Sequence, residues 1–271
     1  MTAPPGTTFN VLAQTRYGPM LYNCNDRYVG GSLATYGEFS AGEATMFRQL
    51  VQEDAVVVEA GANIGAHTVL LAQLVGELGT VHAFEPQRLV FQTLCANLAL
   101  NQCVRVFAHQ QGLGENRGEM VLPNVDPRQS NNFGGLSLLA DGPGEKVEIV
   151  TIDSLGLDRC DLIKADVEGM EVPVIAGARK TIARCRPLLY LENDRAEQSP
   201  ALISLVQSMG YRIWWHLSPL FTPDNHARNP VDIFGGIVSI NILCQPAEVA
   251  RPVAGLREVK SPDEDWQTPA T

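Results

Sequence analysis

The sequence predicts an α/β fold with a doubly wound, mostly parallel sheet that ends in an antiparallel strand. Apolar runs of strand length alternate with stretches whose apolar residues recur at helical spacing from about residue 52 onward. An acid and two glycines follow the first of these strands, at the end of a parallel sheet where ligands bind. The last two strands have no helical pattern between them, which indicates an antiparallel pair.

The length, composition and net charge of the chain limit the classes of protein to which it can belong. The chain has 271 residues and 45% hydrophobic content, enough for one large α/β domain with additions. Its 20 Lys+Arg against 30 Asp+Glu give a formal net charge of -10, so we expect no nucleic-acid partner. No targeting segment or membrane-spanning run is evident, and the six cysteines are scattered singly. We therefore expect a cytoplasmic protein with reduced thiols and no membrane partner.

Residues 1–51 predict an N-terminal addition that packs on the main domain. Loose alternation from residue 9 to 36, with Gly-Pro and Gly-Gly pairs, is typical of a β-hairpin or short strands. Ser40 and Glu43 have the spacing of a capping box that opens a helix. Glu38 precedes this helix and is a candidate to close over a cofactor, although packing explains it equally well.

Residues 56–75 have the pattern of a strand, a tight turn and a helix. A β-branched run ends at Glu59, and Gly61 and Gly65 enclose Asn63 before apolar residues recur at helical spacing. The two glycines let backbone amides approach a small ligand, and the helix dipole favours an anionic group there. A nicotinamide fingerprint would have a glycine in place of Asn63, which argues against a dinucleotide.

A second acid follows the next strand. The run Thr80–Phe84 leads into Glu85 and Pro86, and a carboxylate there can accept both hydroxyls of a ribose. S-adenosylmethionine has no phosphate, and an acid with a glycine turn can bind the ammonium and carboxylate of its methionine end. We therefore expect S-adenosylmethionine as the cofactor. Helix capping by Glu59 and Glu85 is the competing interpretation.

The third strand and the segment after it supply further candidates. Gln111 and Gly112 follow the strand Val104–Ala108 and are expected to lie against the adenine, because loops at the carboxyl ends of parallel strands line the ligand crevice. Residues 115–150 then interrupt the alternation, with two strands around a polar, glycine-rich loop. A mobile surface insertion explains this segment equally well. The candidate substrate residues in the loop are Asn131, Asn132 and Phe133.

The pattern after residue 150 predicts two more parallel strands, the antiparallel pair of strands and a C-terminal tail. Residues 161–166 form a strand followed by one helix to about Ala183, and residues 187–192 form another strand. The tail from residue 246 carries four prolines and is expected to be flexible. The chain is thus expected to divide into residues 1–51, 52–245 with the insertion 115–150, and 246–271.

Several of these motifs together resemble those of one family. They are Glu59–Gly65, Phe84–Pro86, Thr151–Leu155 and Ile163–Glu171. They are similar to successive motifs of the FkbM family of class I S-adenosylmethionine-dependent methyltransferases. The resemblance implies a seven-stranded Rossmann-like sheet and O-methylation of a hydroxyl on a sugar, a glycan or a secondary metabolite. A methyltransferase acting on a protein side chain, a catalytically silent cofactor-binding scaffold and a nicotinamide-dependent oxidoreductase are the alternatives.

Methyl transfer to a hydroxyl requires alignment of donor and acceptor and removal of a proton. Asp166, at the end of its strand, and His216, whose ordinary pKa lies near neutrality, are the candidate catalytic residues. Asp166 is also a cofactor-binding candidate, and His216 beside two tryptophans can equally be a packing residue. Asn193 and Asp194 are expected to contact a small-molecule or glycan acceptor. A homo-oligomer is left open.

Catechol O-methyltransferase-like enzymes present an acid after one strand and an acid-Asn pair after the next to a divalent ion. By that likeness, Asp166, Glu192 and Asn193 are candidate ligands for Mg²⁺, which would lower the pKa of a bound hydroxyl. Helix capping by the same residues is the alternative.

Overall fold

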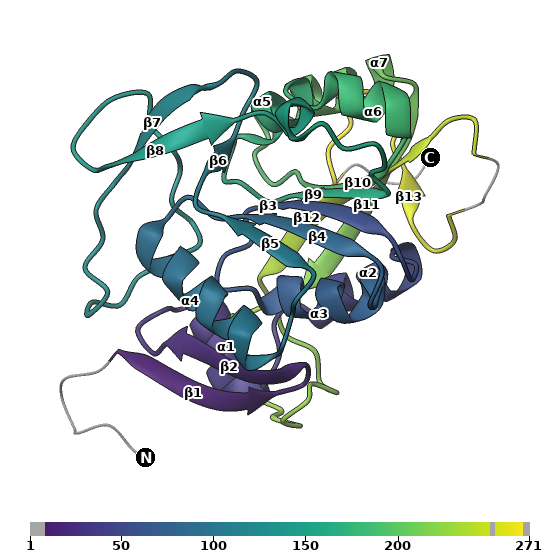
Figure 1. The fold of residues 1–271 in the computed structure, drawn as a ribbon. Helices are drawn as coiled ribbons and strands as arrows, with labels where there is room; N and C mark the ends of the chain where they lie inside the picture. The colour runs from purple at the N-terminus through teal and green to yellow at the C-terminus, as the bar shows by residue number, and fades with distance from the viewer. Residues whose placement is uncertain (1–8, 250–252, 268–271) are drawn as a thin grey trace.

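The computed structural model describes residues 9–249 and 253–267, and a sheet of eight strands forms its centre (Figure 1). The strand order is β13-β11-β12-β10-β9-β3-β4-β5. The strands are β3 (Val56–Ala60), β4 (Thr80–Phe84), β5 (Val106–His109), β9 (Leu162–Ala165), β10 (Leu188–Glu192), β11 (Tyr211–Pro219), β12 (Val238–Pro246) and β13 (Arg257–Glu258). Strands β3, β4, β5, β9 and β10 are parallel, and β12 is antiparallel to both β10 and β11. The predicted mostly parallel sheet and antiparallel final pair are confirmed, and β13 adds a short eighth strand.

Helices cover both faces of this sheet, as the doubly wound prediction requires (Figure 1). One layer contains α2 (Ala41–Leu50), α3 (Ala66–Val75) and α4 (Arg88–Leu100), and the other contains α5 (Glu171–Ala176), α6 (Arg179–Cys185) and α7 (Ser199–Ser208). Alternate residues of β3 point into different layers: Val57 belongs to the core cluster with α2 and α3, and Val58 to the cluster with α5, α6 and α7. Both valines are fully buried, which explains the continuous apolar run in the sequence.

The chain reverses its winding direction between β3 and β9. From β3 it proceeds to β4 and β5 on one side, then crosses to β9 and β10 on the other. Such a switch point leaves a crevice at the carboxyl ends of the two central strands. The glycine turn after β3 and the residues after β9 therefore lie side by side at this crevice.

The predicted N-terminal hairpin is confirmed as β1 (Asn10–Thr15) paired antiparallel with β2 (Gly18–Asn23). It is tied to the sheet by the buried side chain of Asn97 on α4. The Asn97 oxygen accepts the Leu21 amide at 2.6 Å, and its nitrogen donates to the carbonyls of Leu21 at 2.9 Å and Ile64 at 2.7 Å. One amide thus joins the hairpin to the glycine turn.

Helix α1 (Val29–Tyr36) was not predicted, because the Gly30-Gly31 pair was interpreted as a turn. The Asp26 carboxylate accepts the Gly30 amide at 2.8 Å and the Tyr28 amide at 3.2 Å, and so satisfies free donors where the helix begins. A Cβ at Gly30 would lie 2.4 Å from the Asn23 carbonyl oxygen. The glycine is there for a close approach to the hairpin.

The segment 115–150 contains β7 (Gly118–Leu122) and β8 (Glu145–Val150), which confirms the two predicted strands. With β6 (Gly112–Leu113) they form a three-stranded sheet in the order β6-β8-β7. The loop between β7 and β8 crosses to the N-terminal addition, where the Arg27 amide donates to the Asn131 carbonyl at 2.9 Å. The segment therefore spans the mouth of the crevice.

The helix predicted as continuous to Ala183 is two helices, α5 and α6, that break at Gly177. A Cβ at Gly177 would lie 2.0 Å from the Gly114 carbonyl oxygen, so the backbones of the two segments touch there. Asp153, in the short 3₁₀ helix η1 (Ile152–Leu155), accepts the amides of Lys180 at 3.0 Å and Thr181 at 2.7 Å and thereby starts α6.

The tail expected to be flexible instead pairs with the sheet edge over part of its length. β12 extends to Pro246, and β13 pairs with β11, with Arg257 opposite Trp215. Val259 is only 4% exposed and joins the core cluster. Two parts of the tail, 250–252 and 268–271, lie outside the described residues, as do residues 1–8 of the N-terminal addition.

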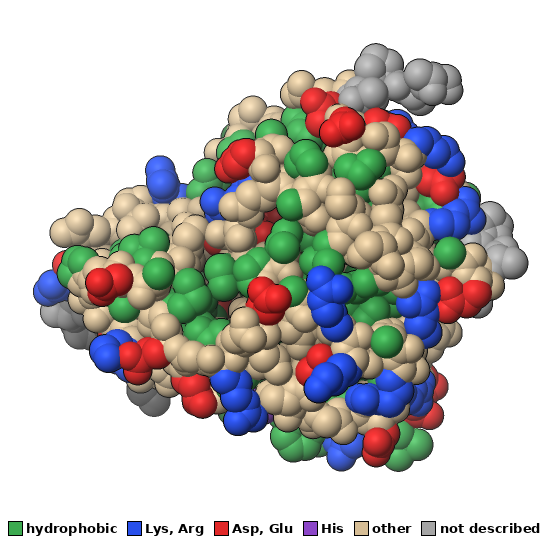
Figure 2. All heavy atoms as spheres, turned by 90° about the horizontal axis from the view of Figure 1, so that it is seen from above, with side chains coloured by type: hydrophobic (Ala, Val, Ile, Leu, Met, Phe, Trp, Pro, Cys, Tyr) green, Lys and Arg blue, Asp and Glu red, His purple; other side chains and the backbone are tan. Residues whose placement is uncertain are grey.

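Charged side chains of both signs are interspersed on the face seen in Figure 2. None of the helices in the described part of the chain has the length and apolar character needed to cross a bilayer.

The core position of Val259 predicts its contribution to stability. Val259→Ala should lower the free energy of unfolding by about 2 kcal/mol, because it removes buried methyl groups and leaves a cavity. Urea unfolding measures this loss. Val249→Ala removes the same atoms at a site that is 40% exposed and should change stability by less than about 0.5 kcal/mol. Equal effects of the two substitutions would contradict the packing of the tail.

Candidate functional site

Two adjoining pockets lie at the carboxyl ends of the central strands and form one crevice. Both are lined by the same five residues: Gly61, Glu85, Gly134, Asp166 and Glu168. We call the first pocket the leucine half, because Leu113, Leu122, Leu136 and Leu138 line it. We call the second the lysine half, because Lys164 lies in it among acidic side chains.

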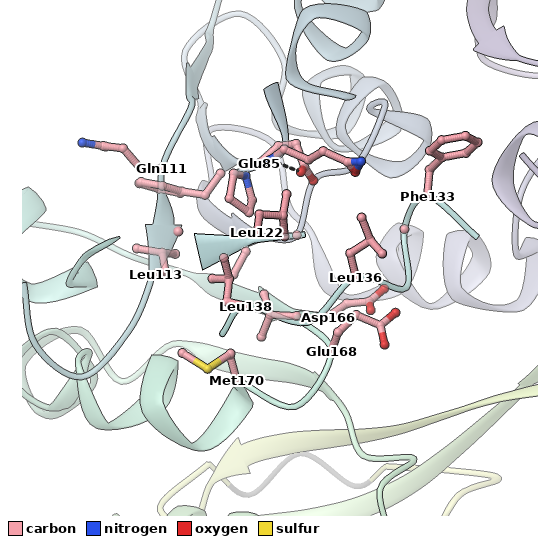
Figure 3. A pocket seen from close by; sticks show the side chains of 18 residues that line it. Glu85, Gln111, Leu113, Leu122, Phe133, Leu136, Leu138, Asp166, Glu168 and Met170 are labelled. Atoms are coloured by element: carbon pink, nitrogen blue, oxygen red, sulfur yellow. Dashed lines mark hydrogen bonds between the residues drawn. The ribbon is translucent and has the colours of Figure 1, made fainter. Parts of the chain in front are cut away.

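The leucine half is an apolar slot between the sheet and the 115–150 segment (Figure 3). Leu122, Leu136 and Leu138 come from that segment, and Met170 faces them from the other side of the slot (Figure 3). Besides the shared Gly61, Glu85 and Asp166, four more residues expected to contact the cofactor or the substrate line this half: Pro86, Gln111, Gly112 and Phe133. A flat heterocycle would fit between such walls.

The glycine turn after β3 brings backbone against backbone. Gly61 has a φ of 78°, and a Cβ there would lie 1.8 Å from the Asp166 carbonyl oxygen. Gly65 has a φ of 87°, and a Cβ there would meet Leu94 at 2.8 Å. Asn63 also has a positive φ, of 51°, and its amide donates to Glu85 at 3.0 Å. The turn thus needs its two glycines for steric reasons.

Glu85 lies at the junction of the two halves. Its carboxylate accepts the Asn63 amide at 3.0 Å and the Gln87 amide at 2.8 Å, one at each oxygen. Burial raises the pKa of Glu85 to about 7, although the two amides act in the opposite direction. Each oxygen retains a lone pair for a hydroxyl of a ligand.

Lys164 is the centre of the lysine half. The β3–β9 register places it directly opposite Glu59, with its Nζ 3.5 Å from the Glu59 Oε1 and 3.8 Å from the Asp166 Oδ2. Burial opposes a charged lysine, but Glu59, Asp166 and Glu43 raise the pKa of Lys164 above its ordinary value. The Glu59 Oε2 accepts the Thr68 hydroxyl at 2.7 Å, and its buried Oε1 makes no hydrogen bond within the described chain.

Sequence reasoning missed Glu43 as a site residue. It interpreted Ser40 and Glu43 as a capping box, but the Ser40 hydroxyl donates to the Glu43 carboxylate at 2.8 Å and caps no backbone amide. Glu43 is 3% exposed and lines the lysine half from α2. Burial and the nearby Asp166 raise the pKa of Glu43, whereas Lys164 lowers it. No local signal separates such an acid from a cap, because its burial depends on the packing of α2.

The acids after β9 and β10 converge, but in a different set from the one predicted. Carboxylate oxygens of Asp166, Glu168 and Glu192 lie within 4.8 Å of one another. The amide nitrogen of Asn193 donates to the Ser199 hydroxyl at 2.9 Å. The structure therefore brings together Asp166 and Glu192 of the predicted ligand set and adds Glu168 to them.

Cations of the protein already neutralise two of these three carboxylates. Arg195 pairs with Glu168 at 2.8 Å, and Lys164 approaches Asp166. Burial raises the pKa of Glu168 to about 7, and raises that of Glu192 well above its ordinary value. A resident Mg²⁺ would have to compete with these two cationic side chains for the carboxylates. The three carboxylates therefore do not fit this ion well.

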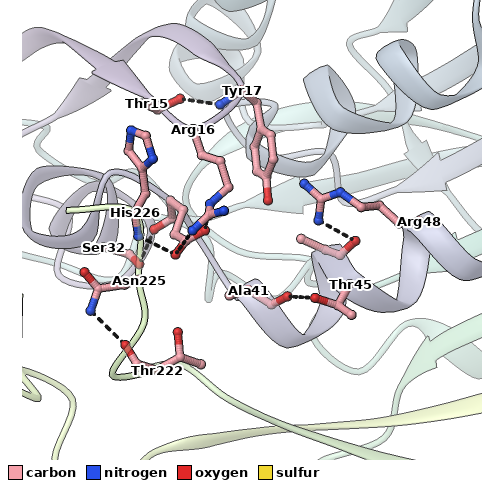
Figure 4. A network of polar contacts seen from close by, with 12 residues as sticks. Thr15, Arg16, Tyr17, Ser32, Ala41, Thr45, Arg48, Thr222, Asn225 and His226 are labelled. Atoms are coloured by element: carbon pink, nitrogen blue, oxygen red, sulfur yellow. Dashed lines mark hydrogen bonds and ion pairs between the residues drawn. The ribbon is translucent and has the colours of Figure 1, made fainter. Parts of the chain in front are cut away.

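Two predicted residues lie in a separate cleft on the α2 side of the sheet. The Glu38 carboxylate pairs with Arg16 and accepts the His226 amide at 2.8 Å, so it joins the N-terminal addition to a C-terminal loop (Figure 4). His216 lines the same cleft, and its Nδ1 lies 2.7 Å from the Tyr190 hydroxyl. Glu38 is therefore not placed to bind a ligand of the crevice, and His216 is not placed as its general base.

The substrate candidates are divided between different surroundings. Asn132 and Asp194 line the lysine half, and Phe133 lines the leucine half. Asn131 forms an isolated backbone β-bridge with Asp26 of the N-terminal addition, and it lines neither half of the crevice. The loop after β7 therefore reaches the crevice with two of its three candidates.

A comparison with protein families decides the classification of the chain. The methyltransferase FkbM domain matches residues 59–213, which is more than half of the sequence. The chain belongs to this family. The central sheet is mostly parallel and ends in an antiparallel pair, as the resemblance to this family implies.

Two relatives match part of this chain of the FkbM family. "Methyltransferase 1" of Beauveria bassiana (strain ARSEF 2860) is 29% identical over 147 residues, with 46% of this chain and 59% of the relative covered. "Methyltransferase sdnD" of Sordaria araneosa is 32% identical over 155 residues, with 45% and 59% covered. The chain thus spans less than two thirds of the length of these curated relatives.

Solved structures include a methyltransferase FkbM from Methylobacillus flagellatus KT, with a TM-score of 0.48, 21% identity, and 74% of this chain and 50% of that chain covered. A SAM-dependent O-methyltransferase from Thermotoga maritima has a TM-score of 0.47, 17% identity, and coverage of 79% and 66%. TYW2 of M. jannaschii, in complex with AdoMet, has a TM-score of 0.48, 13% identity, and coverage of 90% and 89%.

The close approach at Gly61 can be tested by adding a Cβ. Gly61→Ala should destabilise the protein by more than about 2 kcal/mol, because the new atom would meet the Asp166 carbonyl in addition to the strain of a positive φ. Gly235→Ala is the matched control, since Gly235 has a φ of 62° and open space around its Cβ position. Urea unfolding of both variants separates backbone strain from the clash. Equal losses would contradict the assigned contact.

The pKa of Glu85 predicts a pH-dependent stability. A carboxyl whose folded pKa is raised from its ordinary value to about 7 binds more protons when folded, so unfolding becomes easier as pH rises between those two values. Glu85→Gln removes this carboxyl, and with it its contribution to the pH dependence of stability. The free energy of unfolding of the variant, measured relative to the wild type, should therefore rise from pH 4.5 to pH 8 by roughly 2–3 kcal/mol. A difference that is constant with pH would contradict the assignment.

Proposed function

We propose that this crevice binds S-adenosylmethionine and catalyses transfer of its methyl group to a hydroxyl of a small-molecule acceptor. One observation carries the proposal: the glycine turn and Glu85 stand between an apolar slot and a charged cluster, within a chain of the FkbM family. The donor has the same sequence of parts, with a flat base, a ribose diol and a charged amino-acid end.

The residues present fit that donor. The leucine half accepts the adenine, and the free lone pairs of Glu85 accept the ribose hydroxyls. The Glu59 Oε1 faces Lys164 at 3.5 Å without a hydrogen bond, and it offers, with the neighbouring acids of the lysine half, an acceptor for the ammonium group. The glycine turn lines the lysine half at Gly61, Ala62 and Asn63, and so borders the place of the charged amino-acid end.

The lysine half supports the proton transfer that O-methylation needs. We assign Asp166 as the group that takes the acceptor proton, since it lines both halves and its side chain is 37% exposed. As the acceptor oxygen bonds to the methyl carbon, the carbon–sulfur bond breaks and its electron pair returns to sulfur, which leaves a neutral thioether. Lys164, 3.8 Å from Asp166, orients the carboxylate, and the proton passes from Asp166 to solvent.

Binding of the donor is tested first by titration calorimetry with S-adenosylmethionine, S-adenosylhomocysteine and NAD. The two adenosyl compounds should bind and NAD should not, with no change after EDTA treatment. Glu85→Ala should weaken both adenosyl ligands about tenfold or more, because charge-assisted hydrogen bonds to the ribose are lost. Glu77→Ala, an exposed site on the α3 side, is the control and should leave both affinities unchanged.

Turnover is the second measurement of the same proposal. With methyl-labelled S-adenosylmethionine and a pool of alcohols, phenols and sugars, the protein should give a labelled ether. Asp166→Asn should lower the yield about 100-fold with little loss of donor affinity. Failure of both adenosyl compounds to bind in any condition would overturn the proposed function, whereas binding without transfer to any compound would favour a catalytically silent scaffold.

A further inference from the structure

We propose that the acceptor is an alcohol or phenol with an apolar body, rather than a free sugar or an anionic compound. This inference rests on the proposed function and names the substrate class of the same crevice. Two features of the lysine half carry it: an apolar wall near the mouth and a negatively charged floor.

The wall comes from two segments that lie far apart in the sequence. Tyr28, Val29 and Phe39 belong to the N-terminal addition, whereas Leu220, Ile237 and Ile240 belong to the segment between and along β11 and β12. All six line the lysine half. An acceptor in this half therefore contacts hydrophobic side chains as well as the charges.

The two segments are joined by a buried tyrosine. The Tyr36 hydroxyl donates to the Val231 carbonyl at 2.9 Å and accepts the Ile233 amide at 2.9 Å. Tyr28 stacks on Phe234 with ring centroids 6.0 Å apart. These contacts hold the 220–237 segment in place although Ile237, at the mouth, is 42% exposed. Such an apolar surface beside a substrate crevice is stabilised when an apolar ligand covers it.

The floor has the opposite character. Seven carboxyl side chains and one lysine line the lysine half: Glu43, Glu59, Glu85, Asp166, Glu168, Glu192 and Asp194, with Lys164. His67 adds no positive charge, because burial lowers its pKa to about 3. A carboxylate or phosphate on the acceptor would be repelled there without an available cationic partner among the described lining residues.

The same floor distinguishes a hydroxyl from an amine. The carboxylates favour an ammonium ion, but a protonated nitrogen has no lone pair with which to attack the methyl carbon. An amine should therefore bind without reacting. A neutral hydroxyl retains its lone pairs and can give its proton to Asp166. A free sugar would place some of its hydroxyls against Val29, Phe39 and Ile237, whose side chains offer no hydrogen-bond partner.

The test uses three probes that share one body: phenylpropanol, phenylpropylamine and phenylpropanoate, with glucose as the sugar. Calorimetry on protein saturated with S-adenosylhomocysteine should rank the amine as tightest and the alcohol next, with phenylpropanoate and glucose at least about tenfold weaker than the alcohol. With methyl-labelled S-adenosylmethionine, label should pass to the alcohol and not to the amine.

Matched variants assign the effect to the wall. Ile237→Asn should weaken phenylpropanol binding about tenfold, because the contact with the body is lost, and should leave the affinity for S-adenosylhomocysteine unchanged. Leu78→Asn is the control, since Leu78 is 74% exposed beside the amino end of β4 and lies outside the crevice. It should leave both affinities unchanged.

The outcomes separate this inference from the proposed function. If S-adenosylhomocysteine binds but glucose or phenylpropanoate binds as tightly as phenylpropanol, the acceptor class is overturned while donor binding stands. Methylation of the amine in preference to the alcohol also overturns it, as does an Ile237→Asn variant with unchanged phenylpropanol affinity. If S-adenosylhomocysteine does not bind, the proposed function fails and the acceptor class fails with it.

Discussion

The buried ion pair of Lys164 with Glu59 is the interaction on which the crevice depends. The parallel pairing of β3 and β9 places the two side chains opposite each other, at the point where the sheet changes its winding direction. Both are almost completely buried, so removal of either would leave a charge without compensation. Asp166 and Glu43 are then brought close enough to interact with the same ammonium. The charge of Lys164 is what permits so many acids in one half of the crevice.

The two halves of the crevice are built in different ways. The leucine half combines the sheet with the 115–150 segment, whose Leu122, Leu136 and Leu138 line the pocket together with Glu85 (Figure 3). The lysine half takes its walls from α1, α2 and the segment before β12, which meet only because the N-terminal addition packs against C-terminal loops. The buried Glu38 carboxylate, which accepts the His226 amide, and the hydroxyl of Tyr36 hold these distant segments together. This arrangement makes the acceptor half a product of long-range packing.

Local sequence patterns were sufficient to predict the strands that consist of one short apolar or alternating run. The strands at 56–60 and 80–84 were predicted within a residue or so, and two more strands were predicted within 115–150, because each is a short apolar or alternating run between turn residues. The break at Gly177 and the helix at Val29–Tyr36 were missed. In both cases a glycine lets the backbone approach another segment closely. The residues around that glycine do not indicate which segment it contacts. The edge strand β13 was missed because its stability comes from pairing with β11.

The sequence by itself determined the family, the central sheet and the glycine turn with Glu59 and Glu85, because these are short-range patterns of residue type and spacing. The tertiary structure alone decided which acids share a site. It brought Glu43 and Glu168 into the crevice and placed Asn193, Glu38 and His216 in other surroundings. The physical reason is that a side chain acquires its partners and its desolvation from the segments packed around it, and those contacts span large separations along the chain.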